Sequence, residues 1–287
     1  MAATSASDDY ERPMANPAMS APFAEGDFRV GRVISRSVSV LFSRFVTLFI
    51  VAAAAYLPTL LVSLWLPSSA PTGRVQPGQA AQMFAYAILF VAVFIVFSVL
   101  GQAMIVHAAF QDMRRRPVHL GASVRVGLRR FLPLFGIAML LAALILLAVA
   151  LFITLTTFIT PFLLVLTPIP IAFILTVYFV TTPACVVEER GPFGSMRRSM
   201  QLTKGHRWRI FGLELLLVGL LVIASILIGL LGSALRALAG PISAAIGDLV
   251  LNAIWIAYYA VTVAVAYHDL RVAKEGVDIE QIASVFD

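Results

Sequence analysis

The sequence predicts an all-α, polytopic membrane protein with six transmembrane helices, and three observations support this. Of the 287 residues, 60% are hydrophobic and only 13% are charged, whereas soluble domains are nearer half apolar and a quarter charged. The mean hydropathy is +0.94. Residues 131–187 contain no Asp, Glu, Lys, Arg or His, and this stretch is too long for one crossing of a hydrocarbon core about 30 Å thick. It therefore has to fold back on itself.

Six apolar segments are each long enough to cross a membrane as a helix. They lie near residues 45–66, 83–110, 131–155, 161–187, 210–235 and 244–267. The turn within the uncharged stretch is expected at residues 154–160, because Pro161 lacks an N–H and suits the start of the next helix. Residues 1–27 have no apolar run typical of a signal peptide and are expected to form a disordered cytoplasmic tail, with a second tail at residues 271–287.

The positive charges are distributed very unevenly among the loops. Of the 21 Lys and Arg residues, 19 fall in the N-terminal segment, the second loop, the fourth loop and the C-terminal tail. Only Arg74 and Arg236 fall in the loops of the opposite side. Loops rich in Lys and Arg stay on the cytoplasmic side, so both termini are predicted to be cytoplasmic.

The basic stretches themselves predict an internal repeat. Residues 29–43, 120–130 and 192–203 each precede two apolar segments, and each is expected to form an amphipathic helix at the inner surface. An Arg followed by an aromatic residue comes next, in Arg44-Phe45, Arg130-Phe131 and Arg207-Trp208. Each pair of segments then returns to an acid and an Arg, in Asp112 and Arg114, Glu188 or Glu189 and Arg190, and Asp269 and Arg271. We therefore predict a membrane domain of residues 28–270 with units 28–112, 118–190 and 192–270; the alternative is that topology alone collects the basic residues.

One group of candidate site residues is a charge cluster expected at the inner surface, where it would bind lipid headgroups or form ion pairs. It comprises Arg32, Arg36, Arg125, Arg129, Arg130, Glu188, Arg198, Lys204, Arg207, Asp269 and Arg271. Opposite charges partly shielded from water should pair. Asp269 is therefore expected to contact Arg198 or another basic residue of the fourth loop, the alternative being a solvent-exposed pair with Arg271 or Arg114.

A second group consists of polar residues and prolines inside the apolar segments, which are functional candidates because polar groups are costly there. It comprises Gln102, His107, Pro168, Pro170, Glu214 and Asn252. Pro168 and Pro170 are expected to interrupt the fourth helix midway, as at a transport site or as a simple kink. Glu214 is a candidate polar site, with interfacial pairing to Arg207 or Arg209 as the alternative.

The sequence shows no pattern typical of an enzyme. It has no Walker motif, nucleophile elbow or HExxH sequence, and its four histidines are dispersed. The single cysteine, Cys185, excludes a disulfide framework and a multi-cysteine metal site. No cofactor, metal or nucleic-acid partner is expected.

Three stretches resemble a known family. They are Pro183 to Glu188 (PACVVE), Arg198 to Trp208 (RSMQLTKGHRW) and Tyr267 to Asp278 (YHDLRVAKEGVD). They resemble the membrane domain of some bacterial glycerophosphoryl diester phosphodiesterases. The resemblance implies a six-span helical domain of the bacterial inner membrane without a catalytic role, because the activity of that family resides in a separate soluble barrel that this sequence is not expected to form.

Two functions are therefore expected from different classes. The first is a non-catalytic membrane scaffold that engages anionic lipid headgroups, a cytoplasmic or membrane protein partner, or both. The second is a small-solute or lipid transporter or channel that uses a Pro-kinked fourth helix. A continuous polar cavity reaching mid-membrane would favour the second, and a dry apolar core would favour the first.

Overall fold

The computed structural model describes residues 28–65, 77–114, 120–158 and 166–275, and every regular element in these ranges is helical. The α-helices are α1 (Val30–Ser43), α2 (Phe45–Trp65), α3 (Pro77–Met113), α4 (Leu120–Phe158), α5 (Pro168–Tyr178), α6 (Thr181–Val187), α7 (Pro192–Thr203) and α8 (Arg207–Glu275). The predicted all-α class is confirmed. The predicted tail at residues 1–27 lies outside the described residues.

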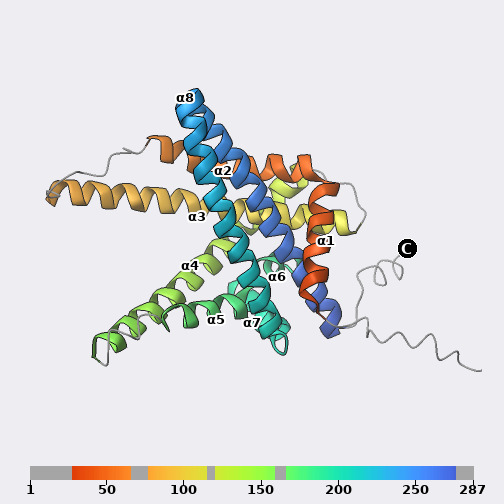
Figure 1. The fold of residues 1–287 in the computed structure, drawn as a ribbon. Coiled ribbons are helices and arrows are strands. Elements are labelled where there is room, and N and C mark those ends of the chain that lie inside the picture. The colour runs from red at the N-terminus through yellow and green to blue at the C-terminus, as the bar shows by residue number, and fades with distance from the viewer. Residues whose placement is uncertain (1–27, 66–76, 115–119, 159–165, 276–287) are drawn as a thin grey trace, which may run out of the picture.

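Helix α8 is two helical arms joined at a sharp break. Gly240 has a φ of 83° and a ψ of −179°, a left-handed conformation that glycine adopts without a steric penalty. Pro241 follows it, and its missing N–H cannot continue the hydrogen-bond ladder. The hydroxyl of Ser243 donates to the carbonyl of Leu235 at 3.0 Å, which ties the arms together beside the break. The first arm (207–239) and the last arm (241–275) run side by side in Figure 1.

Three helical hairpins diverge from a common base (Figure 1). The first limb is formed by α2 and α3, the second by α4 and α5, and the third by the two arms of α8, while α1, α6 and α7 lie where the limbs meet. Five helical stretches within the described ranges are long and apolar enough to cross a membrane. They are Phe45–Trp65, Gly78–Met113, Gly121–Thr156, Pro168–Val187 and Arg207–Glu275. The last of these contains both of the apolar segments predicted near the C-terminus.

The predicted interruption of the fourth apolar segment at Pro168 and Pro170 stays a prediction, because residues 159–165 before it lie outside the described residues. Pro168 is the first residue of α5, a position where a missing N–H costs nothing. A second interruption, which was not predicted from the sequence, lies at residues 179–180, between α5 and α6. Pro183 explains it, because a proline cannot bond to the carbonyl four residues earlier and its ring clashes there. The hydroxyl of Ser199 on α7 caps the neighbouring carbonyl of Val177 at 2.9 Å.

Two further predictions need correction in α4. Residues 120–130 do not form a separate surface helix, because α4 runs without a break from Leu120 through Pro133 to Phe158. No left-handed glycine divides it, whereas Gly205 follows α7 with a φ of 90°. The turn expected from residue 154 begins later, because Thr154 is helical and donates to Ala150 O at 2.8 Å. Residues 159–165 lie outside the described residues.

The part of the last arm between residues 253 and 270 forms the centre of the core. Its small residues Ala257, Ala260, Ala264 and Ala266 are buried, and so is the aromatic ring of Tyr267. Helices α1, α2 and α3 pack against α8. Small side chains let helices approach closely, which is how helices associate when lipid removes the hydrophobic driving force.

Helices α2 and α3 approach closely at Gly101 of α3, where a Cβ would lie 2.5 Å from the Cβ of Ala55 on α2. We expect Gly101→Ala to lower the free energy of unfolding by about 1–3 kcal/mol, because the helices have to separate to admit the methyl group. Thermal unfolding in detergent measures this. The control is Gly219→Ala on the exposed first arm, where nothing lies within 4 Å and the change should be neutral or slightly stabilising. Equal melting temperatures for the two variants would contradict the packing.

Candidate functional site: a charged network at the inner end

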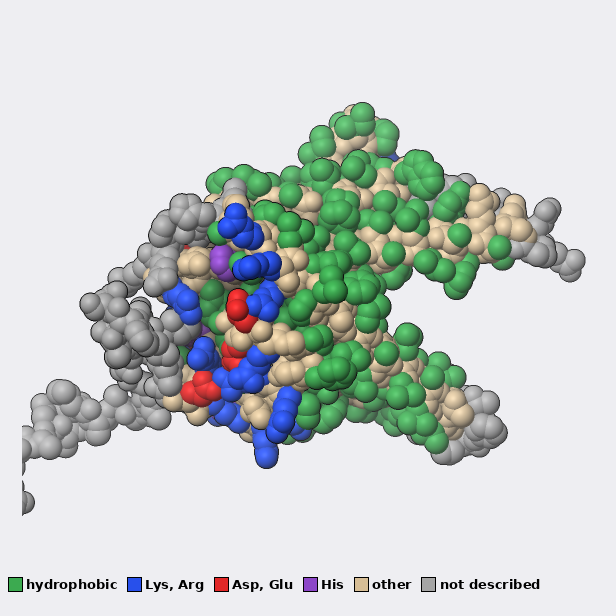
Figure 2. Space-filling view, turned by 180° about the vertical axis from the view of Figure 1, so that it is seen from behind, with side chains coloured by type: hydrophobic (Ala, Val, Ile, Leu, Met, Phe, Trp, Pro, Cys, Tyr) green, Lys and Arg blue, Asp and Glu red, His purple; other side chains and the backbone are tan. Residues whose placement is uncertain are grey.

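Charged side chains gather at one end of the molecule, while the limbs that project from it are almost entirely apolar (Figure 2). We call this end the basic end; it comprises α1, residues 120–131 of α4, α6, α7 and residues 267–275 of α8. The segregation agrees with the one-sided distribution of Lys and Arg in the sequence.

Glu188, just after α6, is the centre of a buried network at the basic end. Its Oε1 accepts hydrogen bonds from Arg198 Nε and from the Tyr267 hydroxyl, both at 2.6 Å. Its Oε2 lies 2.6 Å from Arg190 Nε, and the side chain is only 11% exposed. Burial alone would raise the pKa of the Glu188 carboxyl, but the hydrogen bonds from Tyr267 and Arg198 outweigh burial and hold this pKa below its ordinary value. The carboxyl is therefore charged at neutral pH.

Arg198 and Tyr267 extend this network to other helices. The guanidinium of Arg198 also pairs with Glu275 near the end of α8, and Glu275 accepts a further bond from Arg271 at 2.9 Å. Burial alone would lower the pKa of the Arg198 guanidinium, but the carboxylates of Glu188 and Glu275 outweigh burial and hold this pKa above its ordinary value. The ring of Tyr267 meets Phe110 of α3 edge-on at a centroid distance of 5.8 Å. One connected set of contacts thus joins α3, α6, α7 and the last arm.

Two other acids each pair with an Arg of their own hairpin. Asp112 at the end of α3 accepts bonds from Arg44 Nε and Ser43 Oγ, each at 2.8 Å. Glu189 lies 2.6 Å from Arg130 NH2, and this contact holds the pKa of the exposed Glu189 carboxyl below its ordinary value. Each pair closes the inner end of one hairpin.

The predicted contact between Asp269 and the fourth loop is wrong. Asp269 is 7% exposed and lies 3.4 Å from Arg36 NH1 of α1 and from the ring of His268. Two features of the structure explain this: Arg198 is already engaged by Glu188 and Glu275, and α1 packs along α8. The pair joins the first described helix to the last.

Four basic residues of the predicted cluster face outward, and so does Arg197, which was not part of the prediction. Arg32, Arg125, Arg129, Arg197 and Lys204 are exposed, and none of them takes part in an ion pair among the described residues. Arg207 behaves differently, because its guanidinium lies 5.5 Å from the centre of the Phe173 ring on α5. The predicted cluster therefore divides into a paired, buried set and an exposed, unpaired set.

The polar residues predicted within the apolar segments do not converge. His107 of α3 lies 3.1 Å from Ser123 Oγ at the start of α4, and Gln102 is partly buried elsewhere on α3. Asn252 of the last arm donates to the carboxylate of Asp248 at 2.9 Å. Asp248 in turn accepts a bond from Tyr56 of α2 at 2.9 Å. These contacts join helices in pairs and do not form one site.

Glu214 has an environment of its own between α5 and the first arm. Its Oε2 lies 2.6 Å from Thr176 Oγ1. The same hydroxyl oxygen lies 2.8 Å from the carbonyl oxygen of Ala172, one turn back on α5. The expected alternative, an interfacial pair with Arg207 or Arg209, is not what the structure shows at Glu214, because Arg207 lies over Phe173 and Arg209 donates to Phe28 O at 3.0 Å.

The sequence interpretation missed three buried serines, which lie in α1, near the start of α4 and in α7. Ser37, Ser123 and Ser199 are fully buried. Ser37 and Ser123 each lie eight residues before the aromatic residue of an Arg-aromatic pair, and Ser199 lies nine before Trp208. A serine eight or nine residues before the aromatic residue of each Arg-aromatic pair was the signal that could have identified them. Charge and hydropathy patterns do not detect it, because serine scores as a surface residue on both.

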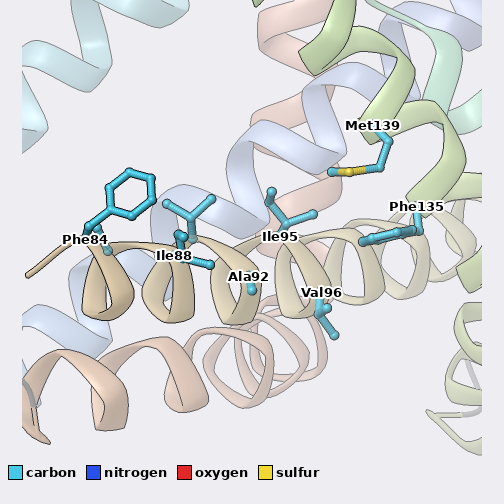
Figure 3. A pocket seen from close by; sticks show the side chains of 9 residues that line it. Phe84, Ile88, Ala92, Ile95, Val96, Phe135 and Met139 are labelled. Carbon is cyan, nitrogen blue, oxygen red and sulfur yellow. The ribbon is translucent and has the colours of Figure 1, made fainter. Parts of the chain in front are cut away.

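An apolar groove lies where the first and second limbs diverge (Figure 3). Its volume is about 470 Å³. Residues of α3 from Phe84 to Val96 form one wall, and Phe135 and Met139 of α4 form the other. Figure 2 shows the open gap between the same two limbs. The groove presents no charged side chain, so it offers hydrocarbon contacts only.

The long apolar helices and the segregated charge define a helical membrane protein. Comparison with models of protein families, with curated proteins and with solved structures finds no match. Within the described ranges, no three His, Cys, Asp or Glu side chains are grouped so that they could hold a metal ion.

The neighbouring residues Arg197 and Arg198 test the buried network directly. Arg198→Gln should lower the free energy of unfolding by about 3 kcal/mol, because it leaves the buried Glu188 carboxylate without its main partner. Arg197→Gln removes an exposed, unpaired charge of the same helix and should cost less than about 1 kcal/mol. Thermal unfolding in detergent compares them, and similar losses in both variants would show that Glu188 is not held as described.

Proposed function

We propose that this protein is a six-crossing inner-membrane protein with both termini in the cytoplasm, built from three repeated units. We propose further that it is a non-catalytic scaffold whose basic end engages anionic lipid headgroups and a cytoplasmic partner. The similarity of three stretches to the phosphodiesterase membrane domain agrees with this proposal. The catalytic function of that family is not part of it.

The break at Gly240 supports six crossings, because it divides a helix of 69 residues into two arms that return side by side. At 1.5 Å per residue each arm is long enough to cross a core about 30 Å thick. The arms begin and end at the basic end, as do the helices of the other two limbs. With positive charge inside, that end faces the cytoplasm.

Equivalent contacts support the three-unit arrangement. A fully buried serine lies in α1, near the start of α4 and in α7, in Ser37, Ser123 and Ser199. In two of the units, the Arg before the first span pairs with the acid after the second, in Arg44 with Asp112 and Arg130 with Glu189. In the third unit Arg207 turns to Phe173 instead.

The observation that carries the lipid proposal is that each of the three segments 29–43, 120–130 and 192–203 exposes both a cation and a large apolar side chain. Arg32 shares α1 with Phe42, which is 72% exposed. Arg129 adjoins Leu128, which is 63% exposed, and Arg197 shares α7 with Phe193, which is 74% exposed. An apolar side chain that enters the acyl region beside a cation at headgroup level is typical of interfacial helices on anionic membranes.

The transporter alternative has less support. The break in the fourth segment does not leave an open polar site, because Ser199 and Thr203 of α7 approach the Val177 carbonyl there at 2.9 and 3.3 Å. The groove between the first two limbs is apolar. A solute pathway needs polar groups that converge in the membrane, and the polar residues within the described limbs lie in separate contacts.

Membrane-impermeant maleimide labelling tests the topology, because Cys185 is the only cysteine and can be replaced by alanine. In that background we expect Ala237→Cys, at the exposed tip of the third limb, to be labelled in intact cells. Ser39→Cys on the exposed face of α1 should be labelled only after the cells are permeabilised. Labelling of Ser39→Cys in intact cells would overturn the proposed orientation.

A fourfold variant tests lipid engagement: Arg32→Gln, Arg125→Gln, Arg129→Gln and Arg197→Gln. We expect added anionic phospholipid to raise the melting temperature of the wild-type protein in detergent and to have little effect on the variant. Each basic residue near an anionic surface contributes about 1 kcal/mol. The control is Arg236→Gln at the opposite end, which should respond like the wild type. An equal response from the fourfold variant, or an equal effect of zwitterionic lipid on the wild type, would contradict the proposal.

A further inference from the structure

Glu214 is a carboxyl group inside a limb that the scaffold proposal does not use. It lies on the first arm of α8, seven residues beyond Arg207 and about 10 Å outward at 1.5 Å per residue. Its neighbour Leu213 is fully buried, and Leu215 is 62% exposed on the outer face of the arm. Glu214 itself is partly buried and faces α5, where Thr176 is its hydrogen-bonding partner.

The contacts of Thr176 indicate which group holds the proton. Its hydroxyl oxygen lies 2.8 Å from the Ala172 carbonyl and 2.6 Å from Glu214 Oε2. A hydroxyl has one hydrogen to donate and can also accept. The carbonyl of Ala172 can only accept, and threonine inside a helix commonly donates to the carbonyl four residues back. If Thr176 donates to Ala172, then the contact with Glu214 is a hydrogen bond only when Glu214 is the donor, which requires a protonated carboxyl.

The surroundings supply no charge that would favour the carboxylate. Tyr259 of the last arm lies within electrostatic reach of Glu214, but a phenol is neutral. Arg209 and Arg207 are the cations that precede Glu214 on the same arm; Arg209 donates to Phe28 O at 3.0 Å, and the guanidinium of Arg207 is directed to the Phe173 ring. None of the described ion pairs includes Glu214. An ionised carboxyl without a charged partner is strongly disfavoured inside a bilayer.

We propose that Glu214 is a proton-binding site between the second and third limbs, and that its O–H group donates a hydrogen bond to Thr176. The bound proton links α5 to the first arm of α8. When the proton is lost, no hydrogen remains between Glu214 Oε2 and Thr176 Oγ1, because the hydroxyl of Thr176 donates its hydrogen to the carbonyl of Ala172. The two limbs are then joined less firmly at this point.

Infrared spectroscopy of the full chain in lipid bilayers reads the protonation state directly. At neutral pH the wild-type spectrum should contain a carboxylic-acid C=O band that is missing from Glu214→Gln. The matched control is Glu189→Gln at the basic end, which should keep the band, because the exposed Glu189 carboxyl is paired with Arg130 and its pKa is held below its ordinary value. In Thr176→Val the band should shift to higher wavenumber, as expected for an acid that has lost its acceptor. If Glu214→Gln removes carboxylate bands and leaves the acid region unchanged, the proposal is overturned.

Stability as a function of pH gives an independent readout. A glutamine side chain is neutral and keeps an N–H donor toward Thr176. Glu214→Gln should therefore match the melting temperature of the wild type at neutral pH. The melting temperature of the wild type should fall at alkaline pH as Glu214 loses its proton, because the protonated fraction falls about tenfold for each pH unit above the midpoint of this titration. The Glu214→Gln variant should lack this part of the fall. A Glu214→Gln variant that is less stable than the wild type at neutral pH, and shows the same alkaline decline, would overturn the proposal.

Discussion

The buried carboxylate of Glu188 is the constraint on which the arrangement of the basic end depends. A charge removed from water has to be compensated by several donors at once, and here they come from Arg198 on α7, Arg190 and Tyr267 on α8. Because Tyr267 also packs against Phe110 of α3, satisfying one carboxylate fixes the relative positions of all three hairpins. The ion pairs of Asp112 and Glu189 need only close single hairpins and are more exposed.

This concentration of specific contacts at one end explains why the limbs can diverge. Beyond the basic end, large side chains such as Leu146, Ile223 and Leu230 are more than half exposed, which would be untenable in water. In lipid there is no hydrophobic penalty for leaving them uncovered, so only shape complementarity holds helices together. It does so where residues are small, as at Gly101 and along the alanine-rich inner half of the last arm. Specific contacts therefore fix the structure at its basic end, and the limbs are loosely packed toward their tips.

The fold class was predictable from composition and length because both are summed over many residues. The ends of the first long helix were also close to prediction, since Arg44 and the last residues before 66 bound an uninterrupted apolar run. The partner of Asp269 was not predictable, because several arginines stand at the same level and only packing decides that α1 lies along α8. The interruption at residues 179–180 of the fourth segment was missed for a different reason. A proline at the start of a helix and a proline inside one have the same sequence signature, and only the position of the helix end distinguishes Pro168 from Pro183.

In the proposed three-unit arrangement, the first and last units differ from a simple repeat for a physical reason. The chain connects the first unit to the second and the second to the third, but no covalent link joins the third to the first. That junction has to be made by side chains. Asp269 reaches Arg36 of α1, and Arg209 at the start of α8 donates to the carbonyl of Phe28 before α1. Because Asp269 is committed to this junction, it is not available to close its own hairpin with Arg207, as Asp112 does with Arg44. The guanidinium of Arg207 lies over the Phe173 ring of the second unit instead. The third unit therefore departs from the repeated Arg–acid pairing because its acid, Asp269, joins the third unit to the first.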